Sequence, residues 1–113
     1  RDRDNLLGSL ILRSENTDDK EVYKNLTELR SSIDNIDSEI NELIAKRMAV
    51  ATEIGNYKKE HNITILQPNR WEEIQKKQLS LGLELGLSTK FIHKYLEAIH
   101  QESIRHQTAV MNK

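Results

Sequence analysis

A few polar side chains of this 113-residue chain fall where a helical pattern calls for apolar ones. Arg47 interrupts an apolar stripe, and Lys58 follows on the same helical face, about 16 Å further along. Ser103 and Gln107 form a second polar pair, one turn apart within another apolar stripe. A guanidinium in an apolar seam is costly unless an anion meets it. These residues therefore predict a pocket for a small ligand with more than one negative charge.

Arg70 belongs to the same group, because it opens a further helix whose N-terminal amides and dipole also favour an anion. Each residue taken alone has a plainer interpretation. A lone Arg in a seam can set the register of a coiled coil or pair with a Glu on a partner helix. A lone Ser or Gln on a helix can bond locally or to water. We favour the pocket, since three helices contribute such groups and their summed charge is positive.

Other kinds of catalytic site are not supported by the sequence. The chain has no Cys, which excludes disulfides, thiolate zinc sites and cysteine nucleophiles. The four histidines follow no metal-ligand spacing, and Ser103 lacks the setting of a serine nucleophile. No Gly-rich phosphate loop is present. We therefore expect no metal and no cofactor.

One long helix must carry both Arg47 and Lys58. Its seam consists of Leu26, Leu29, Ile33, Ile36, Ile40, Leu43, Arg47, Val50, Ile54 and Tyr57. The steps alternate between three and four residues, which is the spacing of a coiled coil. No Pro or Gly interrupts the pattern before Gly55, so we predict a helix over about residues 25–61, about 54 Å long. Two short helices of the same chain cannot cover such a seam, so we predict an all-α chain that pairs with a second molecule.

Two shorter helices are expected to follow. Residues 62–67 indicate an extended connector, and Pro68 suits the first turn of a helix that ends near Gly82. The stretch 81–88, with its two glycines, is predicted to be a loop. Ser88 is a good N-cap for a third helix. The expected buried face of that helix consists of Phe91, Ile92, Tyr95, Leu96, Ile99, Ser103, Ile104, Gln107, Val110 and Met111.

The first 24 residues differ from the rest in composition. A small apolar patch leads into a polar, acidic stretch, and the first residue is Arg1 rather than Met. We therefore expect residues 1–24 to be a linker or the tail of an upstream domain, with an ordered helix as the alternative. Residues 25–113 are predicted to form the helical domain.

The charge balance narrows the choice of partners. The chain carries 17 Lys and Arg against 18 Asp and Glu, which gives a net charge of −1. A nucleic-acid binder or a protein of anionic membrane surfaces would carry a basic excess, so neither is expected. No apolar run is long enough for a transmembrane helix. We expect a cytoplasmic protein.

With these elements in place, the chain resembles the all-helical chorismate mutases over about residues 26–111. The resemblance rests on four short motifs in the order of that family, which are LRSSIDNID, AKRMAVATEIGNYK, the Arg of QPNRWEE, and HQESIRHQ. The closer likeness is to mutase modules fused behind a DAHP synthase. The resemblance implies the conversion of chorismate to prephenate, in aromatic amino-acid biosynthesis, by an intertwined antiparallel homodimer.

The resemblance also implies which residues bind the substrate. Arg47, together with Arg30 of the other protomer, would hold the two carboxylates of chorismate. Ser103 would lie near a carboxylate, and Arg70 corresponds to the family's Arg at the start of the second helix. Helix geometry supports the crossed arrangement, because Arg30 and Lys58 lie about 42 Å apart along one helix and cannot share a small ligand within one chain.

The remaining roles concern the reacting atoms and the ring. By resemblance, Lys58 and Gln107 would contact the breaking ether oxygen. The family often has an acid directly after the Arg of the second helix, where this chain has Trp71. We therefore expect Glu72, or the Glu after it, to accept a hydrogen bond from the ring hydroxyl. Three residues before that Arg, an acid or similar group is replaced by Gln67.

Two alternatives remain open at this point. An isochorismate-pyruvate lyase on the same scaffold would use a similar cationic pocket. A non-catalytic helical module, for dimerisation or for regulation of an upstream enzyme, would place Arg47 and Lys58 in salt bridges between chains.

Overall fold

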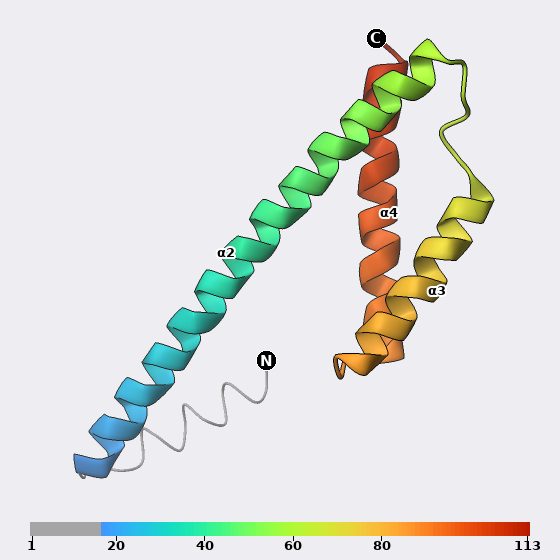
Figure 1. The fold of residues 1–113 in the computed structure, drawn as a ribbon. Helices are drawn as coiled ribbons and strands as arrows, with labels where there is room; N and C mark the ends of the chain where they lie inside the picture. The colour runs from blue at the N-terminus through green and yellow to red at the C-terminus, as the bar shows by residue number, and fades with distance from the viewer. Residues whose placement is uncertain (1–16) are drawn as a thin grey trace. The chain divides into compact units, whose positions relative to one another are not determined.

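The computed structural model describes residues 17–113, and these form three helices without a strand (Figure 1). The helices are α2 (Thr17–Glu60), α3 (Pro68–Glu84) and α4 (Thr89–Met111). The all-α prediction is confirmed for this part of the chain. Most of the predicted tail, residues 1–16, lies outside the described residues, and the domain boundary after residue 24 stays a prediction. None of the described helices is both long and apolar enough to cross a membrane.

The chain divides into two compact units, residues 1–43 and residues 44–113. The described part of the first unit is the N-terminal portion of α2. That helix begins at Thr17, earlier than the predicted start near residue 25, because residues 17–24 contain no Gly or Pro to stop it. Apart from the half-buried Leu26, the apolar seam residues of this unit are well exposed, from 46% for Ile40 to 63% for Leu29 and Leu43. No other described element of this unit is available to cover them.

The C-terminal end of α2 is capped by a residue in the left-handed backbone conformation. Asn62 has a φ of 57°, and the N–H of Ile63 donates to the carbonyl of Lys58 at 2.8 Å. This is the hydrogen-bond pattern of a Schellman motif, in which Asn is the usual substitute for Gly. The chain leaves the helix here and passes through a short connector to α3.

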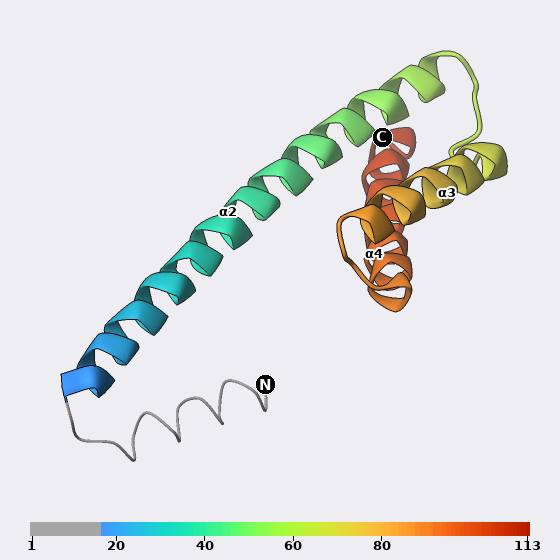
Figure 2. The same ribbon diagram turned by 60° about the horizontal axis from the view of Figure 1, so that its bottom comes forward.

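The second helix of this unit, α3, is longer than predicted, because the glycine that ends it is Gly86 and not Gly82. Gly86 has a φ of 85°, and the N–H of Leu87 donates to the carbonyl of Gly82 at 2.9 Å, which repeats the Schellman pattern. Gly82 is buried within α3. A Cβ there would collide with Cδ1 of Ile92 and lie 3.0 Å from its Cγ1. The glycine therefore lets α3 and α4 pack closely (Figure 2).

The start of α4 is as predicted, because the Ser88 hydroxyl accepts from the N–H of Phe91 at 3.1 Å. Ile92, Leu96, Ser103 and Val110 are buried as expected. The prediction was wrong for Phe91 and Tyr95, which are 52% and 43% exposed within the described chain and stack on each other instead. A helix can point only one of two consecutive residues directly at its neighbour, and Ile92 and Leu96 take that place.

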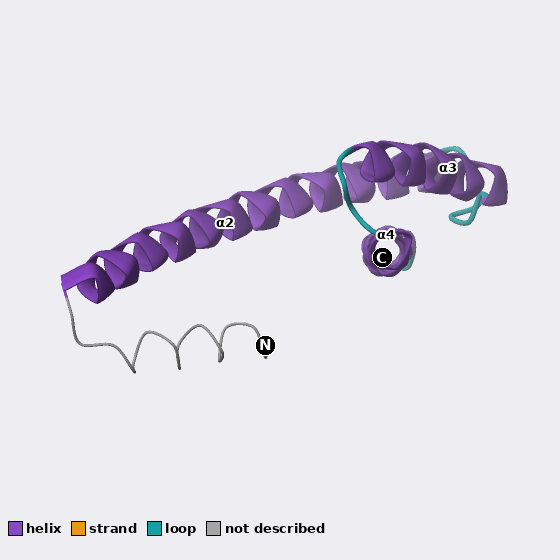
Figure 3. Cartoon of the chain, turned by 90° about the horizontal axis from the view of Figure 1, so that it is seen from below, coloured by secondary structure: helices purple, strands orange, loops and turns teal. Residues whose placement is uncertain are grey.

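The buried apolar residues of the second unit come from the end of α2 and from α4, and α3 packs on α4 at Ile92. Met48, Ala51, Ile92, Leu96 and Val110 form its buried apolar core. Gly55 lies at the closest approach, where a Cβ would come within 2.9 Å of the Gln107 Cα. All of these residues are helical, and the loops are confined to the two short connections (Figure 3). The close approach at Gly55 places Lys58 and Gln107 on facing turns.

Candidate active site

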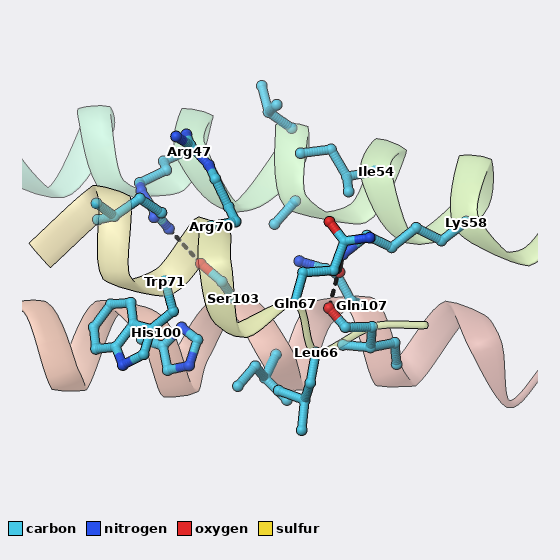
Figure 4. A pocket seen from close by; sticks show the side chains of 15 residues that line it. Arg47, Ile54, Lys58, Leu66, Gln67, Arg70, Trp71, His100, Ser103 and Gln107 are labelled. Atoms are coloured by element: carbon cyan, nitrogen blue, oxygen red, sulfur yellow. Dashed lines mark hydrogen bonds between the residues drawn. The ribbon is translucent and has the colours of Figure 1, made fainter. Parts of the chain in front are cut away.

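A pocket of about 460 Å³ opens in the second unit between α2, α3, α4 and the connector before α3 (Figure 4). Five residues predicted from the sequence line it together, which are Arg47, Lys58, Arg70, Ser103 and Gln107. Ala51 and Ile54 lie between the first two cations, so this part of the wall is apolar and leaves room for a ligand. The structure thus brings residues far apart in sequence into one small space.

Arg47 and Ser103 meet at one end of the pocket. Nη1 of Arg47 donates to Oγ of Ser103, which is buried and in turn donates weakly to Sδ of Met48 at 3.8 Å. Arg47 itself is exposed. The hydroxyl therefore holds the guanidinium against the pocket wall while leaving most of its five N–H donors for an anion.

Lys58 and Gln107 meet at the other end. Nζ of Lys58 donates to Oε1 of Gln107 at 2.9 Å and to the carbonyl of Ile65 at 2.8 Å. The ammonium is half-buried, and its burial lowers the pKa of Lys58 from the ordinary value, because the charged form loses hydration. Since its Oε1 accepts from Lys58, the amide of Gln107 has its NH₂ group left to donate.

Arg70 opens α3 and lines the pocket, but it also has a carboxylate of its own. Its Nη1 donates to Oε1 of Glu73, and the two side chains are 63% and 66% exposed. An ion pair this exposed to solvent contributes little stability, in the range of about 0–1 kcal/mol. A carboxylate of a ligand can therefore compete with Glu73 for this guanidinium.

Among the lining residues that were not selected as site residues from the sequence, three have polar or aromatic side chains, namely Gln67, Trp71 and His100. The Trp71 and His100 rings stack, with centroids 3.8 Å apart and planes 12° from parallel. Figure 4 shows the pair below the Arg47–Ser103 contact. His100 lies one turn before Ser103 on the same face of α4, and this spacing is the signal that could have identified it. Sequence alone left open whether Trp71 faces the core or the pocket.

Two residues predicted to bind the substrate lie outside this lining. Glu72 is exposed on α3 and is not among the residues that line the pocket. Arg30 is exposed on α2 and belongs to the unit of residues 1–43. Their roles stay predictions.

The charge of the lining decides what the pocket can hold. It contains Arg47, Lys58 and Arg70, and no Asp or Glu is found among the described residues that line it. Such a pocket attracts a small anion with more than one negative group. Ser103 accepts from a guanidinium, which does not activate it as a nucleophile. The arrangement can position an anionic molecule and donate hydrogen bonds to it.

Comparisons with known proteins give a consistent result. The model of a family described as chorismate mutase type II matches residues 29–108. A bifunctional chorismate mutase/prephenate dehydratase of Buchnera aphidicola subsp. Schizaphis graminum is 33% identical over 88 residues, which cover 78% of this chain and 23% of the relative. A protein of the same name from Aquifex aeolicus is 42% identical over 78 residues, covering 66% of this chain and 22% of the relative. A 4-amino-4-deoxychorismate mutase of Streptomyces venezuelae is 24% identical over 88 residues and is covered to 85% of its length.

Proposed function

Because the chain belongs to the chorismate mutase type II family, we propose that its pocket converts chorismate to prephenate. The observation that carries the proposal is the wall without carboxylates, with Arg47 and Ser103 at one end and Lys58 and Gln107 at the other. Chorismate carries two carboxylates and one ether oxygen, which matches a pocket with several separated cations. The proposal concerns this module, since the chain spans less than a quarter of its bifunctional relatives.

The first task of the pocket is to select a conformation. The rearrangement is unimolecular and needs no nucleophile, but the enolpyruvyl arm must fold over the ring in a chair-like geometry. In the proposed binding mode Arg47 binds one carboxylate of chorismate, and Arg70 lies near the rest of the ligand. Holding both ends of a flexible molecule in the reactive geometry lowers the entropic part of the barrier.

The second task is to stabilise the negative charge that grows on the ether oxygen as the carbon–oxygen bond breaks. Lys58 and Gln107 would both donate to this oxygen. Their mutual hydrogen bond and the bond from Lys58 to the Ile65 carbonyl support this proposal, because both donors are oriented before the substrate binds. Donors that are already in place cost no reorganisation during the reaction.

We also propose that the working form is an antiparallel homodimer. The exposed seam of residues 29–43 supports this, because an apolar stripe of this length favours a partner helix. In the dimer Arg30 of one protomer would reach the pocket of the other and hold the second carboxylate. The fused DAHP synthase domain and the cytoplasmic location stay predictions.

A pair of matched variants tests the proposed role of Lys58. Lys58→Met keeps the alkyl stem and removes the ammonium, and we expect kcat to fall by about 10²–10³. Lys59→Met is the control, because Nζ of Lys59 bonds to carbonyls at the end of α4 and does not line the pocket. Loss of chorismate absorbance measures the rate. Equal losses in both variants would contradict the assigned role.

Measuring the products formed from chorismate and from isochorismate separates the mutase reaction from the lyase reaction. We expect prephenate to form from chorismate and no pyruvate to be released from isochorismate. Release of pyruvate without prephenate would instead support the lyase. No reaction with either compound, in a folded protein, would support a non-catalytic module.

A further inference from the structure

One titratable side chain of the pocket, His100 on α4, has no role in the proposed mechanism. It is half-buried and lines the pocket between Trp71 and Ser103. Among the described residues, none is hydrogen-bonded to its ring nitrogens, and its ring contact is the stack on the Trp71 indole. A neutral imidazole in this state has one ring nitrogen free to take up a proton.

The charged groups that share the lining with His100 from the facing helices are all positive. They are Arg47 and Lys58 of α2 and Arg70 of α3. The nearby acids of α3 do not offset them, because Glu72 lies outside the lining and Glu73 pairs with Arg70 in the solvent. A proton on His100 in the empty pocket would therefore add to a positive charge that no carboxylate of the described lining balances.

The acids on the same helix as His100 are also engaged elsewhere. Oε1 of Glu97 accepts from Nε2 of Gln101 at 3.0 Å, and Glu102 pairs with Arg105 on an exposed face. Neither Glu97 nor Glu102 lines the pocket. The negative charge that could pair with a protonated His100 must therefore arrive with the ligand.

We propose that His100 is a further substrate-binding residue, which takes up a proton when the ligand enters and binds one of its carboxylates as an imidazolium. The inference rests on the proposed function and adds a fourth cation to the pocket. A dicarboxylate offsets the surrounding positive charge and pairs with the protonated ring. Ligand binding and proton binding at His100 therefore favour each other, and by the same factor in both directions.

The stack on Trp71 suits this role in two ways. The two rings lie 12° from parallel with their centroids 3.8 Å apart, so the indole fixes the plane of the imidazole. A parallel stack leaves the ring edge, which carries both nitrogens, uncovered by the indole. The face of an indole also attracts a cation. Trp71 therefore orients His100 and favours its charged form once a ligand balances the charge.

Calorimetry tests the proton uptake with prephenate, the dicarboxylate product of the proposed reaction. Binding is measured at pH 7 in buffers of different ionisation enthalpy, whose comparison gives the number of protons taken up. We expect about half a proton per site, because histidine changes its charge near this pH. His100→Phe keeps an aromatic ring against Trp71 and should abolish the uptake. His93→Phe is the matched control, since His93 is exposed on α4 outside the lining, and it should retain the uptake.

Fluorescence provides a readout on the unaltered chain. Trp71 is the only tryptophan, and a protonated imidazole in contact with an indole quenches its emission. We expect emission to fall as the pH is lowered through the histidine range, and bound prephenate should move the midpoint of this fall to higher pH. The fall should be absent in His100→Phe.

Kinetics separate binding from chemistry. An imidazolium that holds a carboxylate binds substrate and transition state alike, so at pH 6.5 His100→Phe should raise KM for chorismate by about tenfold with little change in kcat. No proton uptake in the unaltered chain, or equal uptake in His100→Phe and His93→Phe, would overturn the proposal. Proton uptake without any turnover of chorismate would support the role of His100 and overturn the proposed function. A chain that does not bind prephenate would overturn both.

Discussion

At the scale of single residues, the pocket works through side chains that constrain one another. Ser103 holds Arg47, and Gln107 together with the Ile65 carbonyl holds Lys58. Arg47 and Lys58 are thus oriented by neutral partners, whereas the third cation, Arg70, pairs with the carboxylate of Glu73. A neutral partner leaves the full positive charge available to a ligand, whereas a carboxylate would cancel it.

The lowered pKa of Lys58 predicts how activity depends on pH. The ammonium is the proposed donor, so activity requires the protonated form and is lost as the pH rises through the pKa of Lys58. Because burial lowers that pKa, the midpoint of the alkaline fall of kcat should lie below the ordinary lysine value of 10.5. A pH–rate profile measures it. In Lys58→Arg, whose guanidinium stays charged, the alkaline limb should disappear at a lower maximal rate; an unchanged limb would assign it to another group.

At the scale of the helices, the apolar spacing together with Pro68 predicted three helices and their order, and the residue type of Ser88 predicted the N-cap of the last one. Gly82 was misjudged because a glycine can end a helix or admit a neighbouring side chain, and the local sequence is the same in both cases. The stack of Trp71 and His100 joins two helices, so no spacing within one helix could predict it. The polar exceptions at Arg47 and Gln107 were informative because each breaks a regular stripe.

The two glycines at the end of α3 should respond differently to alanine. Gly82→Ala places a methyl group against Ile92, which is only 2% exposed and cannot move aside. We expect the free energy of unfolding to fall by about 1–3 kcal/mol, the usual cost of overpacking. Gly86→Ala meets no atom within 4 Å and should cost about 1–2 kcal/mol through its left-handed backbone alone.

Urea denaturation followed by circular dichroism measures both changes. In an exposed helix interior, alanine would be more stable than glycine by about 1 kcal/mol. A Gly82→Ala variant more stable than the parent chain would therefore show that α3 and α4 do not pack closely at this point.

At the scale of the whole molecule, we propose that a second chain completes the site. If Arg30 crosses to the partner, a dimer of one Arg30→Ala chain and one Lys58→Ala chain contains one intact site. Random exchange makes about half of the dimers mixed, so about a quarter of the parent activity should return. Each variant alone should be inactive. Failure to recover activity, with subunit exchange verified by mass spectrometry, would refute the crossed arrangement.

Gly55 has a consequence for attempts to change the chemistry of this pocket. The glycine does not line the pocket, yet its missing side chain sets the separation between the turns that carry Lys58 and Gln107. A mutational scan that measures only activity would therefore group position 55 with the residues proposed to contact the breaking bond. A variant library meant to widen the pocket should therefore keep this position constant and vary the aromatic wall instead.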